Sequence, residues 1–260
     1  MKEKLSKKNQ SVEKVFQIIE IMTKSKGPMR LNDISLESKI PASTVLRLLN
    51  TMLNYNYINQ NSETLKYSLS MKFCQIGNLI HSQISIRDIV KPYLAELSVK
   101  CQESTCLAIE EDMTVLYIDT MEGPDKMLRT MQRIGKRAPL HSTGVGKLLL
   151  LNYSSEELNT FVGKKGLAEL TSNTITTMSE LIKELQKVRS LGYAFDNEEC
   201  EVGARCLAVP IRDYTGRVVA SMSVSGPVNS FTLEKADSIK DTMLKLSNAA
   251  SKTMGYLAQY

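Results

Sequence analysis

Polar side chains between residues 43 and 51 have the types and spacing needed to bind a polyanion. Ser43 and Thr44 stand at the start of an expected helix, and Arg47, Asn50 and Thr51 follow on its outward face. Hydroxyls and the N–H groups of a helix N-terminus bind phosphates, and arginine reads guanine in the major groove. The pattern predicts a helix that reads double-stranded DNA, with Lys66 as a further contact.

A second set of residues that could bind a ligand lies in the segment PLHSTGVGK, residues 139–147. Ser142, Thr143 and Gly144 precede an apolar helix, where free backbone N–H groups form an anion site. The spacing differs from a phosphate-binding GxxxxGK[ST] loop. When this segment is considered alone, a plain helix cap explains the same residues and is favoured over an anion site.

A third set spans GYAFDNEECEVGARCLAVP, residues 192–210, and the strand after it. Asp196 and several glutamates precede the strand that holds Cys206, and Ser221, Ser223 and Ser225 alternate along the next strand. Alternating residues share one face of a strand. These serines could line a polar pocket or hydrogen-bond to backbone, and spacing alone leaves the two open.

Metal and catalytic chemistry have little support in the sequence. There are two histidines, and Asp196, Cys200 and Cys206 match no standard zinc spacing. The GxSxG motif is absent. We therefore expect no metal, no cofactor and no enzymatic activity. A thiol sensor using Cys206 remains an alternative, although neighbouring carboxylates should raise the pKa of that thiol. An enzyme that uses the pocket serines is a third hypothesis.

Charge is distributed unevenly along the 260 residues. Residues 1–72 hold 12 Lys and Arg against 6 Asp and Glu, a net charge of +6, whereas residues 73–260 have a net charge of −1. A basic segment attached to a larger neutral one suits a polyanion partner for the first, although a solvated basic tail is the alternative. Five cysteines without a CxxC pair favour the reducing cytoplasm. No apolar run approaches the roughly 18 residues of a membrane span.

The elements that must position these residues can be read from hydrophobic spacing. A helix from Ser11, which could cap it, to about Thr23 would bury Val12, Val15, Phe16, Ile19 and Met22. A helix-turn-helix over 31–53 would bury Leu31, Ile34 and Leu36, then Val45, Leu48, Leu49 and Met52, with a turn at 38–41. Short strands at 57–59 and 64–69 predict a hairpin wing.

The rest of the chain predicts a linker helix and a mixed domain. The linker helix runs from Met71 to about Arg87, with Pro92 at the start of the next helix. Strands are expected at 105–109, 115–119, 205–211 and 218–225, and helices at 144–151, 155–161, 178–191 and 233–257. A capping box opens the helix at Thr177 and Gly192 closes it. The fold class is α+β, around a mostly antiparallel sheet.

From about Ser11 to Tyr260 the chain resembles the IclR family of transcriptional regulators. The matching segments are LNDISLESKIPASTVLRLL, KYSLSMKFCQIG, RIGKRAPLHSTGVGKLLL, TITTMSELIKELQKVRSLGYAFDNEECEVGARCLAVPI and GRVVASMSVSGP. The resemblance implies a winged helix-turn-helix over residues 1–70, a linker helix over 71–88 and a GAF-like effector-binding domain over 89–260. It also implies a homodimer, with two dimers pairing into a tetramer, on a palindromic operator.

The resemblance further implies an effector pocket for a small organic acid. Gly144 and Val145 would give backbone N–H groups to the carboxylate of the ligand, Asp196 and Cys206 would contact its other end, and Ser223 and Ser225 would bond its oxygens. Apolar walls would come from Met127, Thr130 and Ala138. A basic run departs from the family pattern and could attract an anion or be solvated: Arg129, Arg133, Lys136 and Arg137. The expected function is a ligand-responsive regulator, with a repressor favoured over an activator.

Overall fold

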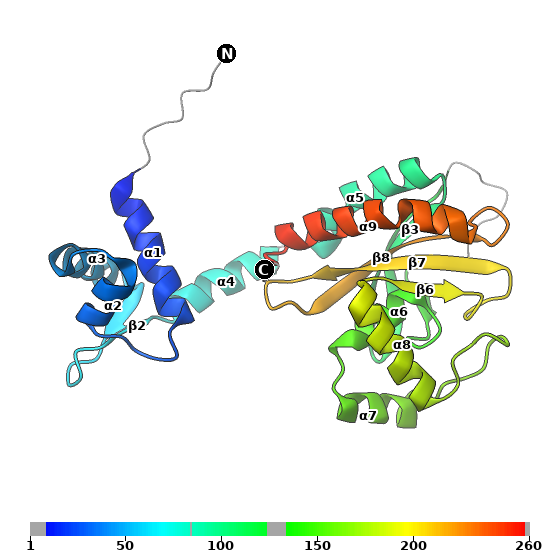
Figure 1. Ribbon diagram of the computed structural model, residues 1–260, viewed down its shortest axis with the longest axis horizontal. Helices are drawn as coiled ribbons and strands as arrows, with labels where there is room; N and C mark the ends of the chain where they lie inside the picture. The colour runs from blue at the N-terminus through cyan, green and yellow to red at the C-terminus, as the bar shows by residue number, and fades with distance from the viewer. Residues whose placement is uncertain (1–8, 84, 124–133, 258–260) are drawn as a thin grey trace, which may run out of the picture. The chain divides into compact units, whose positions relative to one another are not determined.

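The computed structural model describes residues 9–83, 85–123 and 134–257 of the chain. These residues form two compact units, 1–84 and 85–260, and each is a separate body (Figure 1). The expected wall residues Met127 and Thr130, and the basic residues Arg129 and Arg133, lie outside the described ranges.

The N-terminal unit is a three-helix core with a two-stranded wing. Its helices are α1 (Gln10–Lys24), α2 (Leu31–Ser38), α3 (Ala42–Asn54) and, beyond the wing, α4 (Lys72–Gln83). The predicted stripe of α3 is confirmed: Val45, Leu48, Leu49 and Met52 are buried. The turn between α2 and α3 contains Lys39 in the left-handed region, and Pro41 is the N-cap of α3.

The buried face of α1 differs from the expected one. The helix begins at Gln10 because the Asn9 side chain, not Ser11, caps it. Ile18 and Met22 are buried, whereas Val12 and Phe16 are 46% and 60% exposed. The helix therefore packs through its C-terminal half.

The burial predicted for Leu36 in α2 was wrong. Leu36 is 80% exposed, whereas Ile34 is fully buried. Two residues along a helix turn the side chain by about 200°, so both cannot face the same core.

The wing consists of β1 (Ile58–Gln60) and β2 (Tyr67–Leu69), paired antiparallel with Ile58 opposite Leu69. Met29 bridges to Tyr67, which ties the segment before α2 to the wing. Ile58 and Tyr67 are buried against the three helices. The hairpin prediction is confirmed, with the second strand shorter than expected.

The linker region is divided differently from the expectation of one helix to about Arg87. α4 ends at Gln83, and α5 (Ile86–Cys101) begins after Ser85, whose hydroxyl accepts a hydrogen bond from the Asp88 N–H. Pro92 lies inside α5 rather than at its start. Serine at an N-cap satisfies a helix N–H that would otherwise lack a partner, which explains the start at Ile86.

The C-terminal unit is built on one antiparallel sheet in the order β5-β4-β3-β8-β7-β6. Its strands are β3 (Ser104–Glu111), β4 (Thr114–Met121), β5 (Arg137–Ala138), β6 (Ala194–Asn197), β7 (Ala204–Arg212) and β8 (Val218–Pro227). Four of these were predicted. The strands β5 and β6 were not, because segments of two and four residues carry no readable alternation.

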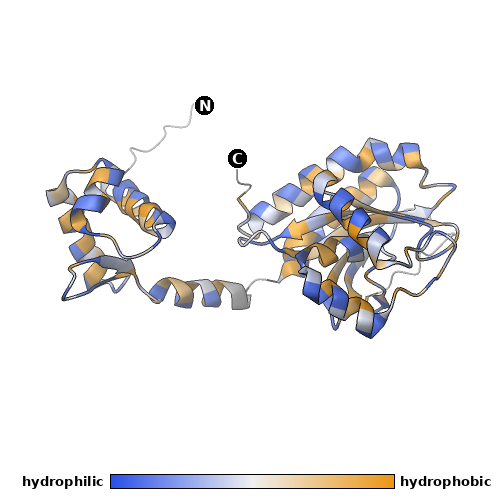
Figure 2. Ribbon diagram, turned by 60° about the horizontal axis from the view of Figure 1, so that its bottom comes forward, coloured by the Kyte–Doolittle hydropathy of each residue, from blue (hydrophilic) through white to orange (hydrophobic). Residues whose placement is uncertain are grey.

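Helices cover both faces of this sheet. α5 and α9 (Leu233–Thr253) lie on one face, and α6 (Gly144–Leu149), the 3-10 turn Leu150–Asn152, α7 (Ser155–Lys165) and α8 (Met178–Leu191) lie on the other (Figure 1). Each layer encloses its own apolar core. The helices show apolar residues on one side and polar ones on the other (Figure 2). The capping of α8 by Thr177 and its end at Gly192 are as predicted.

Candidate functional site

The outward face of α3 carries the polar side chains expected to contact DNA. Ser43, Arg47, Asn50 and Thr51 are exposed, and Thr44 is half-buried. The Thr51 hydroxyl donates to the Arg47 carbonyl at 3.0 Å, so it is engaged within the helix. The Ser43 hydroxyl forms no hydrogen bond with the residues that the structure describes. It is one helical turn from the guanidinium of Arg47, which is a suitable spacing for a phosphate contact and a base contact.

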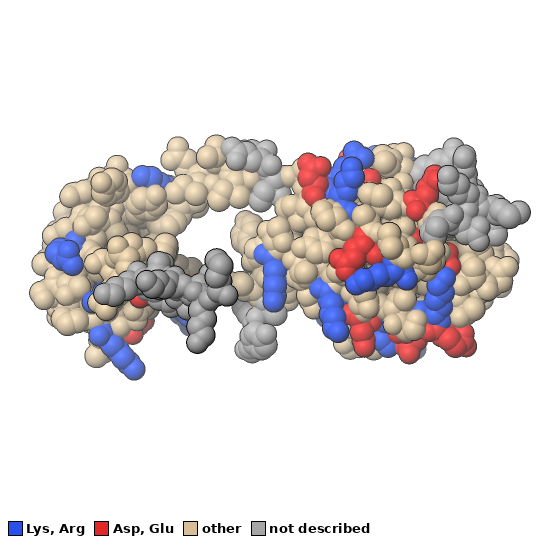
Figure 3. Space-filling model, turned by 90° about the horizontal axis from the view of Figure 1, so that it is seen from above, with Lys and Arg blue, Asp and Glu red and all other residues tan. Residues whose placement is uncertain are grey.

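Charge on the N-terminal unit favours a polyanion. The charged side chains in view on it are mainly Lys and Arg, whereas both signs alternate on the C-terminal unit (Figure 3). Lys66, predicted as a contact, is half-buried just before β2. Lys72 is committed elsewhere: its ammonium bonds the Tyr55 carbonyl at 2.8 Å and lies 4.4 Å from the centre of the Tyr57 ring.

The C-terminal unit holds a cavity of about 580 Å³ at one end of the sheet. Strands β4, β5, β6, β7 and β8 all contribute residues to its wall, as does the 200–204 segment. Asp196, Cys206, Ser225 and Ala138 are on the wall, so the structure brings these four predicted residues together. Gly144, Val145 and Ser223 are buried and do not line the cavity.

Asp196 is held in place by the turn that follows it. It pairs in register with Cys206, and its Oδ1 accepts hydrogen bonds from the N–H groups of Glu199 (2.9 Å) and Cys200 (3.2 Å). The residue is 7% exposed. Burial raises the pKa of the Asp196 carboxyl to about 6, although the two backbone bonds oppose that rise. The group therefore titrates just below neutral pH.

The start of α6 is a helix cap that also serves close packing. The Thr143 hydroxyl accepts from the Gly146 N–H at 3.1 Å and donates to the Pro139 carbonyl at 2.8 Å. A Cβ at Gly146 would lie 2.3 Å from the Leu140 carbonyl oxygen, and one at Gly144 would lie 3.2 Å from the Ala194 carbonyl oxygen. Gly146 is thus required by packing, whatever binds nearby, whereas a side chain at Gly144 would press on the Ala194 carbonyl.

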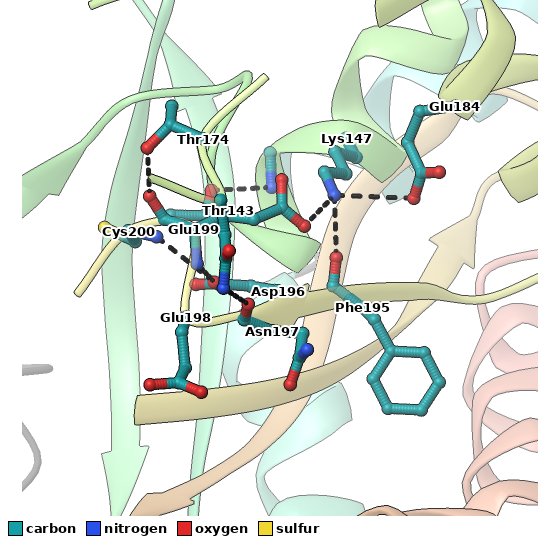
Figure 4. Close-up of polar contacts among 12 residues, drawn as sticks. Thr143, Lys147, Thr174, Glu184, Phe195, Asp196, Asn197, Glu198, Glu199 and Cys200 are labelled. Carbon is teal, nitrogen blue, oxygen red and sulfur yellow. Dashed lines mark hydrogen bonds and ion pairs between the residues drawn. The ribbon is translucent and has the colours of Figure 1, made fainter. Parts of the chain in front are cut away.

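A buried lysine beneath the cavity wall was missed from the sequence. Lys147 is 1% exposed, and its ammonium contacts Glu199 at 2.5 Å, the Phe195 carbonyl at 2.9 Å and Glu184 at 3.4 Å (Figure 4). It joins α6 to α8, to β6 and to the turn that holds Asp196. Its three partners are 37 to 52 residues away in the chain, so local spacing gives no signal for this role.

The Glu199 turn has a second anchor on its other side. Thr174 donates its hydroxyl to the Glu199 carbonyl at 2.7 Å (Figure 4). Thr171 donates its hydroxyl to the Glu198 carbonyl at 2.6 Å. Both threonines are almost fully buried. The wall of the cavity at this turn is therefore fixed by an internal ion pair and by side chains from the loop before α8.

The thiols near the cavity are protected. Cys206 is 6% exposed, and burial, with the nearby Asp196 carboxylate, raises its pKa to about 12. Ser223, fully buried, lies 2.9 Å from the Cys106 sulfur. Ser221 is also fully buried, so two of the three alternating serines belong to the core and only Ser225 reaches the cavity.

Within the described ranges, no group of three His, Cys, Asp or Glu side chains is placed to hold a metal ion. None of the described helices combines the length and the apolar character that a membrane crossing requires.

Comparisons with known proteins agree with this geometry. The IclR helix-turn-helix domain matches residues 11–62, and the bacterial transcriptional regulator IclR C-terminal domain matches residues 79–252. The chain is 32% identical to the HTH-type transcriptional regulator XynR of Escherichia coli, over 96% of this chain and 98% of that protein. It is 31% identical to the transcriptional repressor AllR of the same species, over 92% and 90%.

Solved structures share the fold across both units. The IclR protein of Thermotoga maritima matches with a TM-score of 0.63 at 29% identity, covering 95% of this chain and 99% of that one. The Agobacterium tumefaciens repressor BlcR has the same fold, with a TM-score of 0.72 at 23% identity over 95% and 98%. The winged helix-turn-helix, the curled antiparallel sheet and these matches lead to one conclusion: the chain belongs to the IclR family of DNA-binding transcriptional regulators.

Proposed function

We propose that this protein is a repressor that binds a palindromic operator as a homodimer and changes its operator affinity when a small organic acid occupies the C-terminal cavity. The observation that carries the proposal is the cavity itself, about 580 Å³, with Asp196, Cys206 and Ser225 on its wall. Cavities of this volume suit small ligands held by a few convergent polar groups. Pairing of two dimers into a tetramer, and a chain without enzymatic activity, belong to the same proposal.

DNA binding would use α3 and the wing. Ser43, with the N–H groups at the start of α3, would bind phosphate, Arg47 and Asn50 would reach base edges, and Lys66 would contact the backbone beside the wing. Thr44 and Thr51 would support the contact, because one is half-buried and the other bonds to the Arg47 carbonyl. A DNA ligand supports a cytoplasmic location.

Ligand binding would use the cavity in a manner close to the family expectation. Asp196, Cys206 and Ser225 would contact the acid directly, whereas Gly144, Val145 and Ser223 would act from buried positions outside the wall. A ligand changes an equilibrium only through different affinities for two states. A coupling of about 1–3 kcal/mol between two sites is typical of allosteric proteins.

The geometry favours this function over a thiol sensor. Oxidation requires a thiolate, and the Cys206 thiol is buried with its pKa raised to about 12. Cys200 is half-buried, and burial beside Asp196 raises its pKa to about 11. Neither thiol is fully exposed, and the Asp196 carboxylate beside both opposes the low thiol pKa that a redox sensor needs.

The test combines operator binding with ligand binding. Duplexes selected from random DNA by the purified protein would give the operator. A panel of 2-keto, sugar and aromatic acids would then be tested in two assays. Thermal unfolding measures the melting temperature of the protein, and fluorescence anisotropy measures its affinity for that operator. An acid that raises the melting temperature and changes operator affinity supports the proposal. If no acid alters either quantity, the regulated function fails while DNA binding stands.

A further inference from the structure

Tyr117 faces the cavity, and neither the family resemblance nor the function proposed above assigns it a role. It lies on β4, is 4% exposed and forms part of the cavity wall. Its backbone bonds Lys136 and Gly135 of the adjoining segment. Its phenol forms no hydrogen bond with any residue in the ranges that the structure describes. The hydroxyl is not among the buried polar atoms that lack a partner, so it is open to the cavity, where an oxygen of a ligand can reach it.

The Tyr117 phenol is a hydrogen-bond donor at every physiological pH. Burial raises its pKa well above the ordinary value, and the thiols of Cys106 and Cys206 add to the rise. The phenol therefore stays protonated and matches an oxygen acceptor on a ligand, such as a carboxylate or carbonyl oxygen.

Asp196 offers the opposite chemistry on another strand of the wall. Both backbone bonds to its carboxylate end on Oδ1, and Oδ2 forms none with the described residues. An ionised carboxylate only accepts hydrogen bonds. A ligand that satisfies both Tyr117 and Asp196 must therefore carry an acceptor and a donor.

Charge around the cavity favours a hydroxyl over an ammonium as that donor. Lys136, Arg137 and Arg205 are all on the wall, against Asp196 and Glu201. The guanidinium groups of Arg137 and Arg205 already hydrogen-bond within the chain, at 2.8 Å to Thr114 and 2.7 Å to the Phe231 carbonyl. The exposed ammonium of Lys136 is the cation best placed to attract a carboxylate.

We propose that Tyr117 is a specificity-determining residue and that the effector is a small hydroxylated acid, with an oxygen acceptor on the Tyr117 phenol and a hydroxyl donating to Asp196 Oδ2. The inference rests on the effector role proposed for the cavity. It narrows the class of acid, because keto acids without a hydroxyl leave Asp196 without a donor.

Matched ligands and isosteric variants test the inference. Thermal unfolding and direct titration would compare lactate with pyruvate, and gluconate with hexanoate, with alanine as the ammonium probe. Tyr117→Phe removes only the phenolic oxygen, and Tyr193→Phe is the control, since Tyr193 lies outside the cavity and packs edge-on against Phe195. Asp196→Asn keeps the Oδ1 acceptor and adds a donor.

The expected result is that the hydroxy acid of each pair binds wild type more tightly than its partner and that alanine binds no better than pyruvate. Tyr117→Phe should weaken the hydroxy acid roughly tenfold, and Tyr193→Phe should not. Asp196→Asn should reverse the preference between lactate and pyruvate, which a purely structural role of Asp196 would not do.

Equal binding of both members of each pair, tighter binding of alanine, or unchanged affinity in Tyr117→Phe would overturn the inference while the proposed function stands. Failure of every acid to bind wild type would overturn both. If Tyr117→Phe does not fold, the wild-type ligand preference and its reversal in Asp196→Asn decide the matter.

Discussion

Replacement of Lys147 by Met should lower the free energy of unfolding more than the same replacement of any surface lysine in this chain. Met preserves the straight side chain and removes only the ammonium. The Glu199 Oε1 lies 2.5 Å from that ammonium, and its buried Oε2 has no hydrogen-bond partner among the described residues, so Glu199 would then hold an uncompensated charge. Breaking a buried ion pair in this way costs about 3–5 kcal/mol. Since domains are stable by about 5–15 kcal/mol, the variant should fold but with much of its stability lost.

The pH dependence of this loss has a definite sign. Burial raises the Glu199 pKa in the folded protein, and Lys147 lowers it. Without Lys147 the folded-state pKa rises further above that of the unfolded chain, so the folded variant gains a proton that wild type does not. The deficit of Lys147→Met relative to wild type should therefore shrink as the pH falls.

Urea unfolding followed by circular dichroism, at several pH values, measures both effects. Lys187→Met is the matched control: Lys187 is 66% exposed and 3.9 Å from Glu184, and an exposed pair contributes at most about 1 kcal/mol. A second substitution, Glu199→Gln, should restore most of the stability lost in Lys147→Met. A loss no greater than that of Lys187→Met, or a deficit that grows in acid, would refute the account of Lys147 as an internal anchor.

Four further predictions concern other parts of the molecule. Arg47→Ala should weaken operator binding by about 1–3 kcal/mol at physiological salt, measured by anisotropy, and equal affinities would remove Arg47 from the interface. Gly146→Ala should destabilise the C-terminal unit by about 1–3 kcal/mol in urea unfolding, because its Cβ would meet the Leu140 carbonyl, and an unaffected variant would contradict that geometry. Asp196 has a folded pKa of about 6 against an ordinary value of 3.8, so wild type should lose stability relative to Asp196→Asn as the pH rises between these values, and a flat difference would contradict its burial. Cys206, with its pKa near 12, should resist iodoacetamide at neutral pH until the protein unfolds, and rapid alkylation of the native protein would show that the thiol is accessible.

Periodic elements were predictable from the sequence because they bury one face. The α3 stripe follows from helical i, i+3, i+4, i+7 spacing, the four longer strands from short strand-like segments, and α8 from its Thr177 cap and Gly192 end. Burial was predicted wrongly for apolar residues that do not follow the helical spacing, such as Leu36 in α2. Ser85 went unnoticed as a cap because the apolar spacing continues through it.

The site was predictable in part. Asp196, Cys206 and Ser225 do meet at the cavity, whereas their binding role remains a prediction. The ion pair of Lys147 and the place of Tyr117 on the cavity wall were not readable, because each depends on segments that the fold brings together from distant parts of the chain. Tyr117 also sits beside an irregularity: Asp119 pairs with Leu107 and Tyr117 with Ala108, and no alternation rule predicts such a bulge.

The packing of the two glycines at the start of α6 bears on how this protein could change over time. Any side chain at Gly146 collides with the chain's own backbone, and one at Gly144 presses on β6. Selection on Gly146 therefore acts through folding, before any ligand is involved. The cavity is lined instead by residues of β4, β5, β6, β7 and β8 and of the 200–204 segment, together with Pro139 and Thr143 just before α6. A descendant could exchange one effector for another by mutation of the cavity wall while the GVGK segment stays unaltered. The GVGK segment is therefore diagnostic of the fold, whereas the residues of the cavity wall are diagnostic of the effector.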